Sequence, residues 1–161
     1  MELNCVLLDT SFFIRMLKSN DELHEGTLQY YKYFLSQGFL LKISTISIAE
    51  YCVKGSITEL PLKDLRILPF NLDHAQRAGA FAALVFNQRD PSILPERNII
   101  PNDTKLFAQA EVDPQINFYA TSDTRSINVY DTINASNTSS FRVINIRKPY
   151  YETFSLLDLP F

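Results

Sequence analysis

Four carboxylates of this sequence occupy positions from which they could bind one metal ion together. Asp9 and Asp123 each follow an apolar run. Glu50 lies in the helical segment after the second such run, and Asp103 begins the helical segment before the fourth. Clustered carboxylates repel one another, and in a folded site a divalent cation can neutralise them. Because these ligands are oxygens and the chain has 2 histidines, Mg²⁺ or Mn²⁺ fits better than zinc.

Each of these acids could instead have a purely structural role, with no part in metal binding or catalysis. An aspartate at the start of a helix, such as Asp103, is usually an N-cap that accepts backbone hydrogen bonds. Glu50 could be a solvated helix position, but nearly all of its neighbours are apolar, so an acid there needs a partner or an ion. Asp9 is hardest to explain in this way, because it ends a strand of the buried type and precedes two hydroxyl residues.

Helical and extended patterns alternate along the chain and must position these acids. Continuous apolar runs are typical of parallel strands covered on both faces. Glycine after a helical pattern, and aspartate or asparagine before one, mark helix ends. The predicted strands are 4–8, 39–43, 66–70, 116–120 and 141–146. The predicted helices are 12–18 (helix or turn), 21–36, 44–54, 72–88 and 103–112. Loops are predicted at 90–102 and 134–140, and a helical turn at 126–133. The tail at 147–161 is expected to dock its apolar residues on the rest of the protein.

This alternation predicts an α/β layer fold with a mostly parallel central sheet. No repeat or linker interrupts the 161 residues, so we expect a single domain with a core of about 4–146 and a C-terminal tail, 147–161. In a parallel sheet, ligands gather outside the carboxyl ends of the strands. The four acids are therefore expected to converge at that edge.

The composition narrows the class of partner. With 15 basic and 18 acidic residues the net charge is −3, which argues against a strongly basic nucleic-acid groove but leaves local contacts open.

Cys5 and Cys52 are too few for a disulfide scaffold or a zinc ribbon, and we expect buried thiols, with a bridge between them as the alternative. No run approaches the ~18 apolar residues of a membrane span, and no signal peptide is visible. These features predict a cytoplasmic protein that does not bind membranes.

Five segments stand in an order that has a known counterpart. They are Leu-Leu-Asp9-Thr10-Ser11, then Ile-Ser-Ile-Ala-Glu50, then Ile-Leu-Pro-Phe-Asn-Leu-Asp-His-Ala before the alanine-rich helix, then Asn-Asp103-Thr-Lys-Leu-Phe-Ala-Gln-Ala, and finally Ala-Thr121-Ser-Asp123. Together they resemble a PIN domain, most closely the VapC-like ribonuclease toxins of toxin–antitoxin pairs. No segment is specific alone; the order carries the resemblance over residues 4–146. It implies a PIN-like three-layer α/β/α fold.

The resemblance also implies an activity, a metal-dependent endoribonuclease that hydrolyses RNA phosphodiester bonds with Mg²⁺ or Mn²⁺. Two positions depart from the family pattern. Arg125 stands where a further acid is often found, and Thr104 stands where an alanine usually follows the third acid. The number of metal ions and the RNA substrate stay open for this reason. The matching positions are the acidic metal-site residues Asp9, Glu50, Asp103 and Asp123 and the supporting hydroxyl residues Ser11 and Thr121.

The chemistry of these residues suits such an activity. A metal ion held by Asp9, Asp103 and Asp123 would activate water for in-line attack on a phosphate, with Glu50 completing the ligands directly or through water. A phosphodiester substrate also needs cations. Each candidate is equally a solvated surface charge, and Lys54 could simply pair with Glu50 one turn away. The candidates near the acidic segments are Arg15, Lys18, Lys54, Lys105 and Arg125.

Two other classes of protein fit this sequence less well. A phosphatase of the haloacid dehalogenase type needs an acid two places after Asp9, where Ser11 stands. A receiver-type signalling domain needs an acidic pair near its N-terminus, and that pair is missing. Two alternatives remain, a non-catalytic PIN-like module that binds RNA or protein and a stand-alone RNA-processing nuclease. For a toxin of a type II pair, the resemblance implies a small antitoxin partner and a homodimer.

Overall fold

A central sheet of five parallel strands organises the protein, which we describe from a computed structural model covering residues 3–88, 99–136 and 138–155. The strand order is β3-β2-β1-β4-β5. Leu8, the last residue of β1, is in register with Ile43 on one side and Ala120 on the other. The strands are β1 (Cys5–Leu8), β2 (Leu40–Ser44), β3 (Leu65–Leu68), β4 (Phe118–Thr121) and β5 (Arg142–Asn145).

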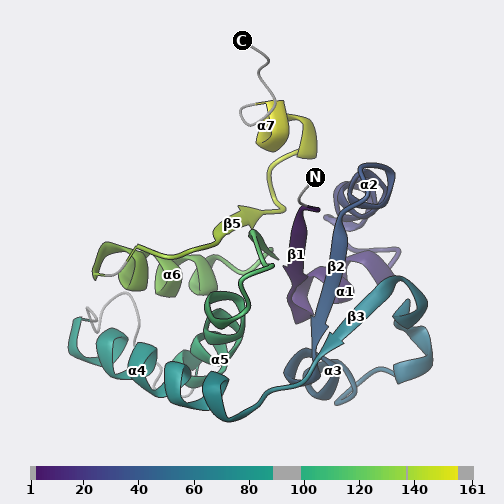
Figure 1. The fold of residues 1–161 in the computed structure, drawn as a ribbon. Helices are drawn as coiled ribbons and strands as arrows, with labels where there is room; N and C mark the ends of the chain where they lie inside the picture. The colour runs from purple at the N-terminus through teal and green to yellow at the C-terminus, as the bar shows by residue number, and fades with distance from the viewer. Residues whose placement is uncertain (1–2, 89–98, 137, 156–161) are drawn as a thin grey trace.

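Helices cover both faces of this sheet and make three layers (Figure 1). Along β1, Val6 and Leu8 face one layer, whereas Leu7 faces the other. The first layer contains α1, α2 and α7, and the second contains α4, α5 and α6. Their bounds are α1 (Thr10–Leu17), α2 (His24–Ser36), α4 (Leu72–Gln88), α5 (Ile99–Val112), α6 (Thr124–Ser136) and α7 (Tyr150–Ser155), while α3 (Thr45–Tyr51) follows β2 directly.

The predicted α/β fold with a parallel central sheet is confirmed, and its strand order explains where a site can form. The chain builds β1, β2 and β3 outward in one direction, then returns to place β4 and β5 on the other side of β1. Connections therefore leave β1 and β4 toward opposite faces, which opens a crevice at their carboxyl ends. Asp9 and Asp123 lie just beyond these two strands.

Two regions predicted as loops are helical in part, because tertiary packing outweighs the local sequence signals there. Helix α5 begins at Ile99 rather than near 103 and includes Pro101, which is tolerated because the first turn of a helix leaves its N–H groups unpaired. Helix α6 runs over 124–136, so the predicted helical turn at 126–133 is confirmed as part of a longer helix, whereas the polar loop predicted from 134 is wrong for 134–136. Its residues have modest helix propensity, but Val129 and Ile133 are buried one turn apart, and tertiary packing decides.

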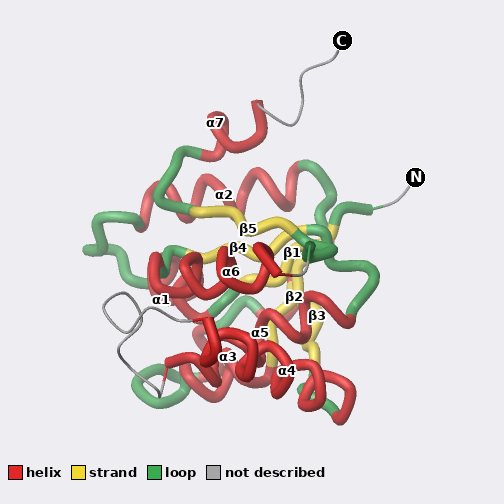
Figure 2. Tube along the Cα trace, turned by 90° about the vertical axis from the view of Figure 1, so that its left-hand side faces the viewer, coloured by secondary structure: helices red, strands yellow, loops and turns green. Residues whose placement is uncertain are grey.

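The C-terminal segment packs against the first layer. Helix α7 lies next to α2, at the opposite end of the molecule from α4 (Figure 2). Phe154 is buried and stacks on Tyr33 with ring centroids 4.6 Å apart, as the predicted docking of the tail requires. The other apolar tail residues lie outside the described residues, as does most of the predicted loop 90–102. They are Leu156, Leu157, Leu159 and Phe161.

The two cysteines do not share one environment. Both are free thiols, but Cys5 is buried in β1 whereas Cys52 is exposed just after α3. The prediction of a buried thiol is therefore wrong for Cys52, because α3 ends at Tyr51 and the chain turns outward there. Burial raises the pKa of Cys5 to about 11, so this thiol stays protonated and unreactive. Within the described ranges, no helix is both long enough and apolar enough to cross a bilayer.

Candidate functional site

The four predicted acids line a single cavity of about 340 Å³ at the carboxyl edge of the sheet. They come from segments spread along the chain: Asp9 precedes α1, Glu50 is in α3, Asp103 is in α5 and Asp123 follows β4. Parallel pairing of β1 with β2 and β4 brings these segments together. The remaining lining residues are Thr10, Ser11, Ile14, Asn102 and Leu106.

Asp9 is held rigidly by hydrogen bonds to both of its oxygens. Its Oδ1 accepts from the Ser11 hydroxyl at 2.6 Å and from the Phe12 backbone N–H at 3.1 Å, so Asp9 is the N-cap of α1. Its Oδ2 accepts from the Thr121 hydroxyl at 2.6 Å. Burial nevertheless raises the pKa of Asp9 to about 6, because the loss of hydration outweighs these bonds. A cation at this carboxylate would offset that loss.

Ser11 and Thr121 do more than orient Asp9. The Ser11 hydroxyl accepts from the Ser122 N–H at 3.0 Å, and the Thr121 hydroxyl accepts from the Asp123 N–H at 3.0 Å. Each hydroxyl therefore links the end of β1 to the segment after β4. This double link sets the position of Asp123 relative to Asp9.

Asp103 is a buried acid with an unused oxygen. Its Oδ1 accepts from the Ser126 hydroxyl at 3.3 Å, whereas its Oδ2 is buried and has no hydrogen-bond partner. Burial, followed by the negative charge of Asp123, raises the pKa of Asp103 to about 7. Because α5 already begins at Ile99, Asp103 lies inside the helix, and its interpretation as an N-cap is excluded.

Glu50 and Asp123 are the accessible acids of the cavity. Glu50 is exposed, and its Oε2 accepts from the Thr10 hydroxyl at 3.0 Å. Its apolar sequence neighbours therefore do not bury it; α3 turns this position toward the cavity. Asp123 is half-buried, and its Oδ1 accepts from the Arg125 N–H at 2.9 Å.

The residues of this cavity fit a divalent cation. An oxygen-only donor set is the kind that Mg²⁺ and Mn²⁺ prefer, and the unpartnered Oδ2 of Asp103 is a buried acceptor that needs a positive partner. As the side chains stand, no three acidic, histidine or cysteine residues in the described part of the chain form a ready group of ligands. The residues that would hold the ion are Asp9, Asp103 and Asp123, with Glu50 directly or through water.

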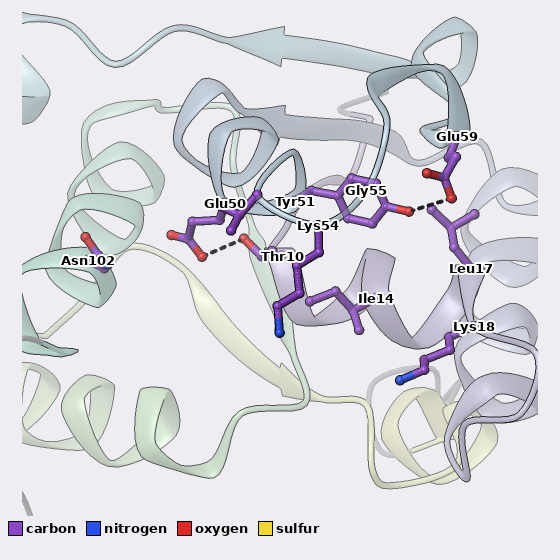
Figure 3. A pocket seen from close by; sticks show the side chains of 11 residues that line it. Thr10, Ile14, Leu17, Lys18, Glu50, Tyr51, Lys54, Gly55, Glu59 and Asn102 are labelled. Carbon is purple, nitrogen blue, oxygen red and sulfur yellow. Dashed lines mark hydrogen bonds between the residues drawn. The ribbon is translucent and has the colours of Figure 1, made fainter.

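The five predicted cations are distributed unevenly. Lys18 and Lys54 line a neighbouring cavity of about 700 Å³ (Figure 3), and Glu50 bonds to Thr10 rather than pairing with Lys54. Arg15 is partly occupied by an ion pair with Asp21 at 2.7 Å, and its Nε lies 3.5 Å from the Ser122 hydroxyl. Neither of the remaining two, Lys105 and Arg125, lines either cavity.

Sequence reasoning missed four polar residues of the site region. Thr10 bonds to Glu50, Ser126 bonds to Asp103, and Asn102 lines the acidic cavity. The guanidinium of Arg147 donates from Nε to the Ser122 carbonyl at 2.8 Å. Arg147 stands shortly after β5, so the rule that singled out polar residues after strands could have found it. Ser126 carries no such signal, because its contact depends on how α5 and α6 pack.

The Thr121 hydroxyl offers a test of this architecture. Thr121→Val keeps the side-chain shape but removes the bonds to Asp9 and to the Asp123 N–H. We expect Mn²⁺ affinity, measured by calorimetry, to fall about 10- to 100-fold, as for other partners that orient metal ligands. The matched control is Thr132→Val, whose hydroxyl donates only within α6, to the Asn128 carbonyl at 3.0 Å. Equal affinities of the two variants would contradict the role of Thr121.

Comparison with known proteins supports the fold. A chain of the VapBC2 complex from Rickettsia felis, solved with a promoter DNA fragment, superposes with a TM-score of 0.54 at 14% identity, covering 87% of this chain and 97% of that chain. A chain of DNA-bound VapBC from Salmonella typhimurium gives 0.55 at 16% identity, covering 88% and 98%. No family model and no curated protein matches the sequence. The PIN-like, VapC-like fold predicted from the sequence is confirmed.

Proposed function

We propose that this protein is a metal-dependent endoribonuclease that hydrolyses RNA phosphodiester bonds and acts as the toxin of a type II toxin–antitoxin pair. One observation carries the proposal most directly. Four acids from four separate segments line one cavity at the edge where a parallel sheet binds ligands, and one of them has a buried oxygen without a partner. Four carboxylates brought together repel one another and destabilise a fold, and a bound metal ion would offset that repulsion.

The chain's own residues divide the work in this mechanism. A bound Mg²⁺ or Mn²⁺ would supply an activated water and neutralise charge on the phosphate. Asp9 is fixed by two hydroxyls, so its carboxylate is preorganised and does not have to reorient during reaction. Asp103 provides its unpartnered oxygen, and Asp123 and Glu50 approach from the accessible side. Thr10 keeps Glu50 at the cavity wall.

A partner belongs to the same proposal. The similar solved chains come from VapBC complexes, and by analogy a small antitoxin would bind this protein and cover the acidic cavity. We also propose a homodimer located in the cytoplasm. The antitoxin partner and the homodimer are proposed by analogy of fold, and each has to be tested separately from cleavage.

The first experiment is cleavage of a mixed RNA pool by the purified protein with Mg²⁺, with Mn²⁺ and with EDTA. Cleavage that appears with metal and disappears with EDTA is the expected result. Cleavage that survives EDTA would point to a contaminating nuclease. If no RNA is cut and calorimetry detects no metal binding, the protein is a binding module and the proposal is wrong.

A further inference from the structure

Tyr119, in β4, is a tyrosine whose hydroxyl core packing does not explain. The residue is fully buried, and its hydroxyl has no hydrogen-bond partner among the described residues. Its ring packs in the second layer against Phe107 and Phe141, with ring centroids 4.9 and 6.3 Å away. A phenylalanine would fill this space equally well, and a buried hydroxyl without a partner costs free energy. The hydroxyl therefore indicates a role other than packing.

The two helices that cover Tyr119 bring polar residues of the site toward it. On α5, Asp103 lies one helical turn before Phe107, whose ring packs on that of Tyr119. On α6, Ser126 lies one turn before Tyr130, and the ring of Tyr130 also packs on Phe107. Residues four apart lie on the same face of a helix, so Asp103 and Ser126 face the layer that holds the ring of Tyr119.

Electrostatic effects on Tyr119 identify the groups around its hydroxyl. Burial raises the pKa of Tyr119 well above its usual value, and the carboxylates of Asp9 and Asp103 add to this effect. The Ser126 hydroxyl lowers the pKa, as a hydrogen-bonding group near the phenol oxygen does. The phenol therefore stays protonated and is a hydrogen-bond donor. The Ser126 oxygen has free lone pairs and can accept from it.

Asp103 is held less firmly than Asp9. Two hydroxyls donate to Asp9, each at 2.6 Å. Asp103 accepts from the Ser126 hydroxyl at 3.3 Å, which is long for a bond between a hydroxyl and a carboxylate. A hydroxyl that itself accepts a hydrogen bond donates a stronger one. A bond from Tyr119 to Ser126 would therefore strengthen the bond from Ser126 to Asp103.

We propose that Tyr119 is a positioning residue of the metal site, whose hydroxyl donates to the Ser126 hydroxyl, which in turn donates to Oδ1 of Asp103 and leaves Oδ2 for the metal ion. This inference rests on the proposed function and adds a residue to its site. The direction of the two bonds is fixed, because an ionised carboxylate only accepts and each hydroxyl has one hydrogen to donate. The two bonds hold Asp103 in one orientation, so the ion meets a ligand that is already placed.

The first test measures metal affinity instead of activity. Full-length wild type and Tyr119→Phe are titrated with Mn²⁺ by calorimetry. We expect about 10-fold weaker binding by the variant, at the lower end of the range for partners that orient metal ligands. Because the hydroxyl of Tyr119 has no partner among the described residues, the midpoint of thermal unfolding in EDTA should stay the same or rise.

The matched control is Tyr130→Phe, which removes a hydroxyl from the same group of packed aromatic rings. That hydroxyl donates to the Phe141 carbonyl at 3.0 Å instead of pointing to an acid of the site. Tyr130→Phe should keep the wild-type affinity for Mn²⁺. Wild-type affinity in Tyr119→Phe, or an equal loss of affinity in Tyr130→Phe, overturns the proposal.

A double-mutant cycle shows whether Tyr119 acts through Ser126. Ser126→Ala removes the hydroxyl between Tyr119 and Asp103, so adding Tyr119→Phe to it should weaken Mn²⁺ binding by less than about twofold. A general structural defect, or a direct bond from Tyr119 to Asp103, would instead cost about 10-fold in both backgrounds. That result overturns the proposal.

The wild type separates this inference from the proposed function. If it binds Mn²⁺ and cuts RNA but Tyr119→Phe binds Mn²⁺ equally well, only the role of Tyr119 is removed. If Tyr119→Phe weakens Mn²⁺ binding as expected but the wild type cuts no RNA, the positioning role stands and the nuclease is removed. A wild type that binds no Mn²⁺ overturns both.

Discussion

Replacing Asp9 with asparagine is expected to lower metal-dependent RNA cleavage by more than about 100-fold, beyond the loss typical of residues that only orient a ligand. The charge of Asp9 is what a cation would bind, and its two oxygens are already fixed by Ser11 and Thr121. An amide keeps the shape and one acceptor oxygen, which can serve Ser11 and the Phe12 N–H, while its NH2 group can donate to the Thr121 hydroxyl, and it carries no charge. The substitution therefore removes the electrostatic contribution and leaves the architecture in place.

The same substitution should not unfold the protein. Asp9 is 6% exposed, and burial already disfavours its charged form. A neutral amide avoids that penalty, so the midpoint of thermal unfolding in EDTA should stay the same or rise. The readouts are initial rates of RNA cleavage with Mn²⁺ and circular dichroism melts. Asp131→Asn, at an exposed position on α6, is the control. Cleavage by Asp9→Asn within a few-fold of the wild type would remove Asp9 from the mechanism.

The metal-free protein is expected to become less stable as the pH rises from about 4 to about 7, the opposite of the usual behaviour of folded acids. In the native state burial raises the pKa of Asp9 to about 6 and of Asp103 to about 7, against 3.8 for an ordinary aspartate. Between these values the native protein holds more protons than the unfolded chain, so the free energy of unfolding falls as protons are removed. Above about pH 8 both groups are ionised and the loss is complete.

The loss amounts to several kcal/mol, since each tenfold change in proton affinity corresponds to about 1.4 kcal/mol. Metal should reverse it. At pH 8 a metal concentration 100 times its Kd adds about 2.7 kcal/mol, whereas at pH 5 the protonated acids bind metal poorly and the gain is small. Urea unfolding across this pH range, with EDTA and with Mg²⁺, measures both effects.

Asp103→Asn is the control that isolates these acids. Burial lowers the pKa of His74, so that group stabilises the fold as the pH rises and partly opposes the trend. The difference between wild type and Asp103→Asn cancels the contribution of His74. In EDTA, Asp103→Asn should become increasingly more stable than the wild type as the pH rises from 5 to 8. The variant should also lose most of the stabilisation by metal. A difference independent of pH would show that Asp103 does not titrate in this window.

The sequence by itself determined the architecture and the identity of the acids. Continuous apolar runs specify buried parallel strands, and polar residues after them must lie at one edge, because parallel strands end together. The bond from Ser11 to Asp9 is equally local, since the two residues are two positions apart at the start of α1. These features depend on periodicity and near neighbours, which a single sequence displays.

Only the tertiary structure decided which side chains meet. Thr121 reaches Asp9 across 112 positions, and the unpartnered oxygen of Asp103 exists because α5 and α6 pack as they do. The same holds for the ion pair that occupies Arg15 and for the two lysines that share one cavity while Lys105 lines neither. Spacing places a residue on an element, but its direction and its partners depend on how the elements rotate and pack against one another. That rotation is set by the summed burial of distant apolar groups, to which no single segment of the sequence contributes enough to be decisive.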